Sequence, residues 1–514
     1  MSDYVIVGAG SAGCVLAARL TEDPSTTVTL IEAGGKGKHP NIVIPAAFAN
    51  QFHTKLDWDF QTDPEPHLGG RSLYVPRGKG LGGSSNMNAM LYVRGRPLDY
   101  AMWVERGATG WDWDTVLPYF IKAEDNQRGA SEFHGAGGPT RVEDERSPRK
   151  MTGRIMAAVA NAGVPRVDDY NGPEQDGLSP VQVFQKGGRR WSSADAYLRP
   201  NMKRPNLTVL TKKLVAGIQI ENGRATGVKL AGGDVVSAGK EVIVSAGAIG
   251  SPQLLMLSGI GPADHLREVG VDVVTDLPVG ENLQDHPYAT AIFESSEPDS
   301  LFGADKPKPM LEWLMRKTGP LTSSVAEAFA FVRTRPGLPA ADIQFHLAPA
   351  YFYKHGSEEF EGHAMTFGPV LVAPKSRGSV RLRSKEPGDK PRILTNTLAE
   401  RDDLDSLVAG VKLAREWAGT EPLKSTIPRE LHPGADVDSD EQIADWVRAE
   451  VELLYHPACT CPMGSVLDPE LRVNGIDGLR VADASVFPVI PGGNTNAPTM
   501  MVAERAADLI KQAG

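Results

Sequence analysis

The sequence contains few cysteines, and their spacing does not suit cross-links. Its 514 residues include only Cys14, Cys459 and Cys461, too few for a disulfide framework. Cys459 and Cys461 are two residues apart, so a bridge between them would be strained, and only His456 is close enough in sequence to join them as a metal ligand. The three thiols are therefore predicted to be buried structural side chains, and no metal site is expected.

Long apolar runs and an excess of positive charge are also missing. No run approaches the ~18 residues that a membrane span needs, and the first predicted strand begins at Tyr4, which leaves no room for a signal peptide. We expect a cytoplasmic protein without a membrane span, and peripheral membrane contact stays open. The 54 Lys and Arg and 64 Asp and Glu residues give a net charge of −10, which argues against a nucleic-acid partner.

The length and the element pattern predict two domains. The composition, 41% hydrophobic and 23% charged, is that of a globular protein, and 514 residues are too many for one ordinary core. The predicted fold class is α/β and α+β, with a Rossmann-like dinucleotide domain built from separated segments and an α+β substrate domain with an antiparallel sheet. The first domain is assigned to residues 1–155, 196–297 and 447–514, with an extended or lid segment near 36–75, and the second to 156–195 and 298–446.

Five short strands are predicted between residues 207 and 246. Alternating apolar residues and glycine turns over 207–210, 215–220, 225–230 and 235–237 favour an antiparallel meander. The apolar run 241–246 predicts a separate strand of the parallel type.

A glycine motif near the N-terminus predicts a bound dinucleotide. Gly8, Gly10 and Gly13 follow a predicted strand and open a predicted helix, where they permit a tight turn, close approach of a pyrophosphate and close helix–strand packing. The helix N-terminus offers free N–H groups to the phosphates. Glu32 lies nineteen residues after Gly13, a distance that suits a carboxylate on the ribose hydroxyls and disfavours NADP. The motif leaves NAD and FAD both open.

Longer motifs further along the chain decide between the two. Residues 78–88, Gly-Lys-Gly-Leu-Gly-Gly-Ser-Ser-Asn-Met-Asn, resemble the first signature of the glucose-methanol-choline (GMC) oxidoreductases, and residues 247–261 resemble the second. The segments 280–286, 455–457 and 494–499 match in the same order. The nearest resemblance is to the bacterial choline-dehydrogenase-like and sorbose-dehydrogenase-like members.

The resemblance implies that the cofactor is FAD. Some members attach the flavin covalently through a histidine in the first block, but the aligned residue is Met87, so FAD is predicted to bind non-covalently. Gly82 and Gly83 lack a Cβ and allow the backbone to lie against the planar ring. The predicted cofactor-binding residues are Gly8, Gly10, Ser11, Ala12, Gly13, Glu32, Ala33, Gly82, Gly83, Ser84, Asn88, Ala89, Met90, Leu91, Val215, Ala246, Gly247, Asp483, Ala484, Pro498 and Thr499.

Two further residues are predicted to be catalytic. His456 precedes Pro457, which restrains the ring, and an imidazole suits proton abstraction near neutral pH. By the resemblance His456 is the base. Asn496 matches the second active-site position of the family, where its amide can donate a hydrogen bond to the developing alkoxide. The local alternative is that Asn496 caps the last helix.

The predicted activity is oxidation of a small-molecule alcohol to an aldehyde or ketone, with hydride transfer to the flavin and reoxidation by oxygen, a quinone or a dye-type acceptor. One alternative is a lyase on the same fold, of the hydroxynitrile lyase or fatty acid photodecarboxylase type. Another is an NAD-dependent dehydrogenase that uses only the N-terminal fold. The alcohol, the electron acceptor and the oligomeric state stay open.

Overall fold

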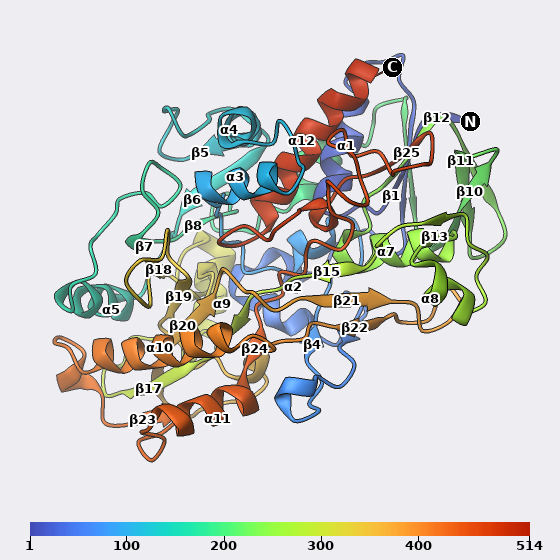
Figure 1. The fold of residues 1–514 in the computed structure, drawn as a ribbon. Helices are drawn as coiled ribbons and strands as arrows, with labels where there is room; N and C mark the ends of the chain where they lie inside the picture. The colour runs from blue at the N-terminus through green and yellow to red at the C-terminus, as the bar shows by residue number, and fades with distance from the viewer. Residues whose placement is uncertain (514) are drawn as a thin grey trace.

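The computed structural model describes residues 1–513 and contains two large sheets (Figure 1). The first sheet has the strand order β10-β11-β12-β1-β2-β9, and β25 pairs with β12. The strands β12, β1, β2 and β9 run parallel, as in a dinucleotide-binding fold. The strands of this sheet are β1 (Ser2–Val7), β2 (Val28–Glu32), β9 (Leu207–Thr211), β10 (Val215–Glu221), β11 (Arg224–Leu230), β12 (Val235–Val244) and β25 (Leu479–Val481).

Three of the five predicted strands in this region are different in the structure. β9 was assigned to the antiparallel meander, but it pairs in parallel with β2 at the opposite edge of the sheet from β10. The strands predicted at 235–237 and 241–246 are one continuous strand, β12. Its first part pairs antiparallel with β11 and its last part pairs parallel with β1. The exposed first part and the buried last part have different hydrophobic patterns, which is why the sequence suggested two strands.

The first and last helices of the chain pack together on this sheet (Figure 1). The helix α1 (Ser11–Leu20) is almost entirely apolar or small, and its buried face lies against α12 (Asn496–Ala513). A third helix, α7 (Gly247–Leu257), follows β12 directly. The N-termini of α1 and α7 both follow the carboxyl ends of parallel strands, where the ligands of open α/β sheets bind.

The second sheet is antiparallel and eight-stranded. Its order is β23-β17-β20-β19-β18-β7, and β16 pairs with both β20 and β24. Its strands are β7 (Gly177–Pro180), β16 (Pro287–Tyr288), β17 (Ala291–Ser295), β18 (Ala328–Val332), β19 (Ile343–Ala348), β20 (His363–Leu371), β23 (Glu430–His432) and β24 (Glu452–Leu453). The helices α5 (Lys150–Asn161) and α10 (Arg401–Ala418) pack against it, and α11 (Asp440–Glu450) packs on α10.

The strand pairing divides the chain differently from the domain boundaries expected from sequence. β16 and β17 belong to the second sheet, although residues 196–297 were assigned to the cofactor domain. β24, within 447–514, also joins the second sheet, and the boundary at residue 155 falls inside α5. These segments are adjacent in sequence to cofactor-domain motifs, but β16 and β17 pair with β20 and β24 pairs with β16, which places all three in the second sheet.

Shorter elements connect and cover the two sheets. Residues 36–75, expected to form an extended or lid segment, contain α2 (Pro40–Val43), a 3-10 helix Pro45–Gln51 and the paired strands β3 (Phe60–Gln61) and β4 (Tyr74–Val75). None of the helices within residues 1–513 is long and apolar enough to cross a bilayer. The other elements are α3 (Pro97–Glu105), α4 (Trp113–Ala123), β5 (Glu124–Asn126), β6 (Thr140–Asp144), β8 (Gln182–Val183), α6 (Arg199–Asn201), β13 (Ile260–Gly261), α8 (Ala263–Glu268), β14 (Thr275–Asp276), β15 (Glu281–Leu283), α9 (Pro307–Arg316), β21 (Gly378–Arg381) and β22 (Arg392–Leu394).

Candidate active site

A cavity of about 530 Å³ is lined by residues of both sheets. At one end its wall is the turn after β1, including Gly8 and Gly10. At the other end its wall includes His346 of β19, Thr366 of β20 and His456. One continuous space therefore joins the dinucleotide motif to the predicted catalytic histidine.

The three motif glycines differ in what surrounds them. A Cβ on Gly13 would lie 1.9 Å from the carbonyl oxygen of Gly8, and a Cβ on Gly8 would lie 2.4 Å from the carbonyl oxygen of Ser245. Both glycines are therefore required by packing within the protein. A Cβ on Gly10 would meet no protein atom within 4 Å, and Gly10 lines the cavity. This open space beside the N-terminus of α1 fits a pyrophosphate that approaches the backbone closely.

Glu32 ends β2 at the wall of the cavity. Its two carboxylate oxygens accept hydrogen bonds from the backbone N–H groups of Ala9 (3.0 Å) and Gly34 (2.7 Å). Burial raises the pKa of this carboxyl group, and the hydrogen bonds from Gly34 and Ala9 act in the opposite direction. The side chain is thus held in one orientation, with lone pairs left for ribose hydroxyls.

The Asp483 carboxylate lies at the cavity wall and accepts hydrogen bonds from three protein groups. Its oxygens accept hydrogen bonds from the Gly247 N–H (2.9 Å), the Ser251 hydroxyl (2.5 Å) and the Ser485 N–H (2.8 Å). The carboxylate therefore fixes the start of α7 and positions the backbone of Gly247 at the cavity wall.

The Gly82–Leu91 block packs directly on the dinucleotide turn. Gly82 donates its N–H to the carbonyl oxygen of Ala9 (2.8 Å), and a Cβ on Gly83 would lie 2.6 Å from the Cα of Gly10. Arg190 holds the block from behind, with Nη1 donating to the carbonyl of Ser85 (3.2 Å) and to Oδ1 of Asn88 (2.7 Å). Burial lowers the pKa of Arg190 to about 9.

Most of the residues expected to bind the cofactor line this cavity, and four lie behind its wall. The four are Gly13, Gly82, Met90 and Pro498, whose contacts are with other protein atoms. The residues at the wall are Gly8, Gly10, Ser11, Ala12, Glu32, Ala33, Gly83, Ser84, Asn88, Ala89, Leu91, Val215, Ala246, Gly247, Asp483, Ala484 and Thr499, together with His456 and Asn496.

The backbone around His456 is held in an unusual conformation. Tyr455 has a φ of +66°, in the left-handed region that a bulky residue rarely adopts. The Arg77 guanidinium donates to the carbonyl oxygen of Tyr455. Oδ1 of Asp285 accepts the N–H groups of both His456 and His286, each at 2.8 Å. These bonds fix the turn that brings the His456 side chain to the cavity.

The hydrogen bonds of the His456 ring define its tautomer. Its Nε2 is 3.2 Å from Nδ2 of Asn494, and because an amide nitrogen only donates, Nε2 carries the lone pair. The proton is therefore on Nδ1, which donates to Nδ1 of His286 at 3.0 Å. Burial, with contributions from His286, His346 and Arg77, holds the pKa of His456 well below its usual value. The ring is neutral near pH 7, with its basic atom at Nε2.

Asn496 lies on the same cavity but makes different contacts. Its Oδ1 accepts a hydrogen bond from the Ser11 hydroxyl at 2.6 Å, and its Nδ2 approaches Sδ of Met500 at 3.7 Å. It is the first residue of α12, where the sequence also suggested a helix cap. The amide next to His456 belongs instead to Asn494, two residues earlier.

Sequence reasoning did not show which residues surround His456. Asn494, Asp285 and His286 all lie in motifs that were noticed for their family resemblance, but nothing in the spacing showed that they meet His456. His346, on β19, offers no sequence signal at all. Its Nε2 is buried without a hydrogen-bond partner among the described residues, and burial lowers its pKa to about 3.

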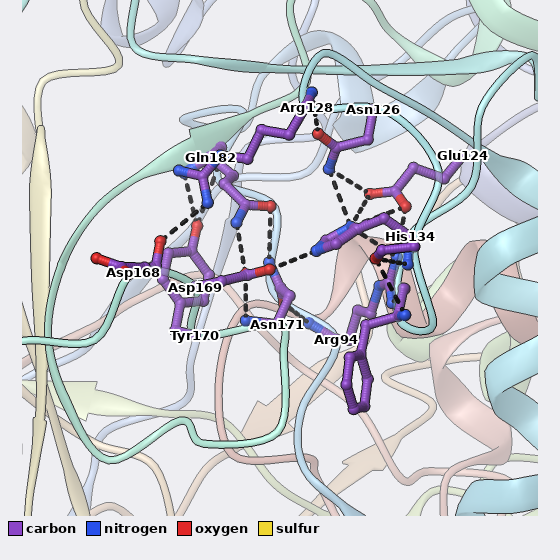
Figure 2. Close-up of polar contacts among 12 residues, drawn as sticks. Arg94, Glu124, Asn126, Arg128, His134, Asp168, Asp169, Tyr170, Asn171 and Gln182 are labelled. Carbon is purple, nitrogen blue, oxygen red and sulfur yellow. Dashed lines mark hydrogen bonds and ion pairs between the residues drawn. The ribbon is translucent and has the colours of Figure 1, made fainter.

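A buried polar cluster supports the segment that follows the Gly82–Leu91 block (Figure 2). Arg94 pairs with Glu124 at 2.6 Å, and His134 lies between Glu124 (3.0 Å) and Asp169 (2.5 Å). Burial raises the pKa of Asp169, but the hydrogen bond and charge of His134, together with hydrogen bonds from Asn171 and Gln182, outweigh it and the pKa falls to about 2. His134, which looks like a loop residue in the sequence, is thus part of a buried ionic network.

Fold and cavity together define an enzyme that binds a dinucleotide across the carboxyl edge of a parallel sheet, with a neutral histidine at the far end of the cavity. Models of the GMC oxidoreductase family match residues 2–288 and 374–503. The chain belongs to the GMC oxidoreductase family and is an FAD-dependent oxidoreductase.

Known relatives and solved structures match this chain along nearly its whole length. An uncharacterised GMC-type oxidoreductase of Mycobacterium tuberculosis is 44% identical over 99% of both chains. The oxygen-dependent choline dehydrogenase of Brucella ovis is 42% identical over 99% of this chain and 95% of its own. The pyridoxine 4-oxidase of Mesorbium loti has a TM-score of 0.90 at 32% identity, covering 100% of this chain and 99% of its own. A formate oxidase of Aspergillus oryzae has a TM-score of 0.93 at 28% identity, covering 100% and 98%.

Proposed function

We propose that the protein oxidises the CH–OH group of a small alcohol to an aldehyde or ketone, with His456 as the base. The observation that carries this proposal is the neutral His456 ring with its lone pair on Nε2, at the wall of the cavity that starts at Gly10. FAD, when bound, supplies the acceptor for the hydride that leaves the alcohol carbon. The acceptor that reoxidises the flavin is oxygen, a quinone or a dye-type molecule.

The chain's own groups perform the proton transfer. Nε2 of His456 exchanges its hydrogen bond from Asn494 for the substrate hydroxyl and accepts the hydroxyl proton, and the Nδ1–H···Nδ1 hydrogen bond to His286 keeps the ring in the tautomer that this step needs. The amides of Asn494 and Asn496 supply N–H donors on the same wall for the oxygen as it gains negative charge. Aromatic side chains at this end exclude water from the step, and they include Phe48, Phe52, Tyr288, Phe352 and Tyr455.

FAD binding is proposed to be non-covalent and to use the residues at the cavity wall. The open space beside Gly10 takes the pyrophosphate, Glu32 takes the ribose hydroxyls, and the Gly83–Leu91 block lies next to the ring system. Met87 also lines the cavity, and its thioether offers no nitrogen for a covalent bond to the flavin.

The decisive experiment compares flavin reduction in His456→Ala with that in His346→Ala. Both variants remove an imidazole from the same cavity, but only His456 is bonded to Asn494 and Asp285. A screen of primary and secondary alcohols, including choline and pyridoxine, first identifies a substrate that bleaches the flavin anaerobically.

The rate of anaerobic reduction, followed by stopped flow, is expected to fall ~10²–10⁴-fold in His456→Ala with FAD retained. The rate for His346→Ala is expected to stay within about tenfold of the unmodified enzyme, because deleting a group that is not the base leaves the proton-transfer path intact. An unchanged rate in His456→Ala would remove this residue as the base. A flavin that no alcohol bleaches would favour the lyase reading over oxidation.

A further inference from the structure

An apolar patch is exposed on α9 and on the loop before it. The chain exposes few large hydrophobic side chains, and four of these lie between residues 302 and 315. Leu311, Leu314 and Met315 have the i, i+3, i+4 spacing of one helix face, and Met315 is 74% exposed. Phe302 completes the α9 patch, which we define as Phe302, Leu311, Leu314 and Met315. Exposed apolar clusters of this kind mark interaction sites.

The opposite face of α9 explains why the helix is held firmly in place. Trp313 is buried against Ile44, Ala47 and Leu321, and its indole Nε1 donates to the carbonyl oxygen of Gly188 at 2.9 Å. The helix therefore has two apolar faces, of which one serves the fold. The exposed face is not needed to hold the helix on the protein.

Positive charge surrounds the α9 patch, although the whole chain is acidic. Residues 302–317 carry four Lys or Arg and two acidic residues, in a chain of net charge −10. Lys306 lies over the ring of Phe302 at 5.4 Å, and neither Lys308 nor Arg316 forms an ion pair with any residue that the structure describes. One of the two acids, Glu312, is turned inward and accepts from the Thr318 hydroxyl at 3.0 Å.

We propose that the α9 patch docks this enzyme on an anionic lipid surface. A helix that lies in a membrane interface combines inserted apolar side chains with flanking Lys and Arg that meet anionic headgroups, as α9 does. A symmetric dimer through the same face would place two copies each of Lys308 and Arg316 in one interface, where like charges repel. Four side chains also provide only a few hundred Å², against about 800 Å² per partner in a stable protein interface.

Docking through α9 would bring the segments that α9 packs on, which lead into the cavity wall, close to the lipid surface. The inner face of α9 rests on the 3-10 helix Pro45–Gln51 and on Leu321, and both segments lead directly into cavity residues, Phe48 and Ser324 among them. The strands β10 and β11 lie at the right of the view in Figure 1, away from α9.

The test is co-sedimentation of the FAD-loaded enzyme with vesicles. Binding to mixed phosphatidylglycerol–phosphatidylcholine vesicles is expected to exceed binding to pure phosphatidylcholine, and to fall with added salt. The double variant Leu311→Glu/Met315→Glu is expected to lower the vesicle partition coefficient more than about tenfold, because two inserted apolar side chains are lost. The double variant Lys308→Gln/Arg316→Gln is expected to lower the same coefficient about 25-fold, because each lost cation contributes about fivefold.

The matched control is Val235→Glu/Val274→Glu, which adds two charges at side chains that are each 49% exposed and lie outside the patch. This variant should bind vesicles as the unmodified enzyme does, and all variants should keep their flavin and their rate of dye reduction. Equal binding to both vesicle types, or equal losses in the control and in the α9 variants, would overturn the proposal. Vesicle binding that does not change with salt would also overturn the proposal. The same holds if light scattering shows that the α9 variants only convert a dimer to a monomer.

Discussion

Asp285→Asn tests how the His456 turn is built. The Asp285 carboxyl is buried, its Oδ1 accepts two backbone N–H groups, and its Oδ2 has no hydrogen-bond partner among the described residues. Burial raises the pKa of this carboxyl from 3.8 to about 7, against the opposing effect of Arg77. Asparagine keeps the acceptor atom but cannot ionise, so the substitution separates the hydrogen bonds from the charge.

The raised pKa of Asp285 determines how the stability of the folded protein changes with pH. Well below pH 3.8 the carboxyl is protonated in both the folded and the unfolded chain, so its burial costs no ionisation free energy. As the pH rises from 4 to 7 the unfolded chain ionises first, and the folded protein loses up to about 4 kcal/mol of stability. The Asn variant avoids this loss. We expect it to match the unmodified enzyme within about 1 kcal/mol at pH 4.5 and to exceed it clearly at pH 7.5.

The assay is thermal unfolding of the FAD-loaded enzyme at both pH values, together with stopped-flow flavin reduction. Reduction should be retained, because Oδ1 still accepts the His456 N–H. Asp285→Ala is the control, since it also cannot ionise but leaves two buried N–H groups without acceptors, and it should be less stable than the Asn variant by about 1–3 kcal/mol at both pH values. A Tm difference between the Asn variant and the unmodified enzyme that does not change with pH would refute the reasoning.

Three further predictions concern the cofactor and its site. Gly10→Ala is expected to fold normally but to purify with less FAD. Gly13→Ala should lower Tm as well, because its Cβ would lie 1.9 Å from a carbonyl oxygen. Equal losses of Tm in the two variants would contradict this distinction. Asn496→Ala should slow flavin reduction and keep the pH optimum, and an unaltered rate would leave Asn496 as a helix cap only. Acid precipitation should release all FAD into the supernatant, and yellow precipitate would show a covalent bond despite Met87.

The sequence was informative wherever a motif depends on local backbone geometry. The Gly8–Gly13 turn, the following helix and the acid at Glu32 are local features, so the start of the parallel sheet and its cofactor could be predicted. The last helix was also anticipated at Asn496, and α12 begins there.

Long-range pairing explains what could not be predicted. β9 has the same apolar pattern whether it joins β10 or β2, and only the free edge of β2 selects the parallel partner. In the same way, Asp285 and Asn494 meet His456 from distant segments. Their spacing in sequence therefore contained no sign of the contact. The exposed apolar face of α9 could be found only once the inner face was known to hold Trp313.

The pairing of α1 with α12 has a consequence for how the enzyme is made. Ser11 donates to Asn496 at 2.6 Å, and Arg19 donates to both carboxylate oxygens of Glu504 at 2.8 Å. The wall around the dinucleotide turn thus includes residues that a ribosome adds long after the turn itself. At ~5–20 residues per second, a nascent chain waits tens of seconds between exposing its glycine turn and receiving the helix that closes it. Tight capture of FAD is therefore a late event, and a chain cut short before α12 would leave that glycine turn without its closing helix.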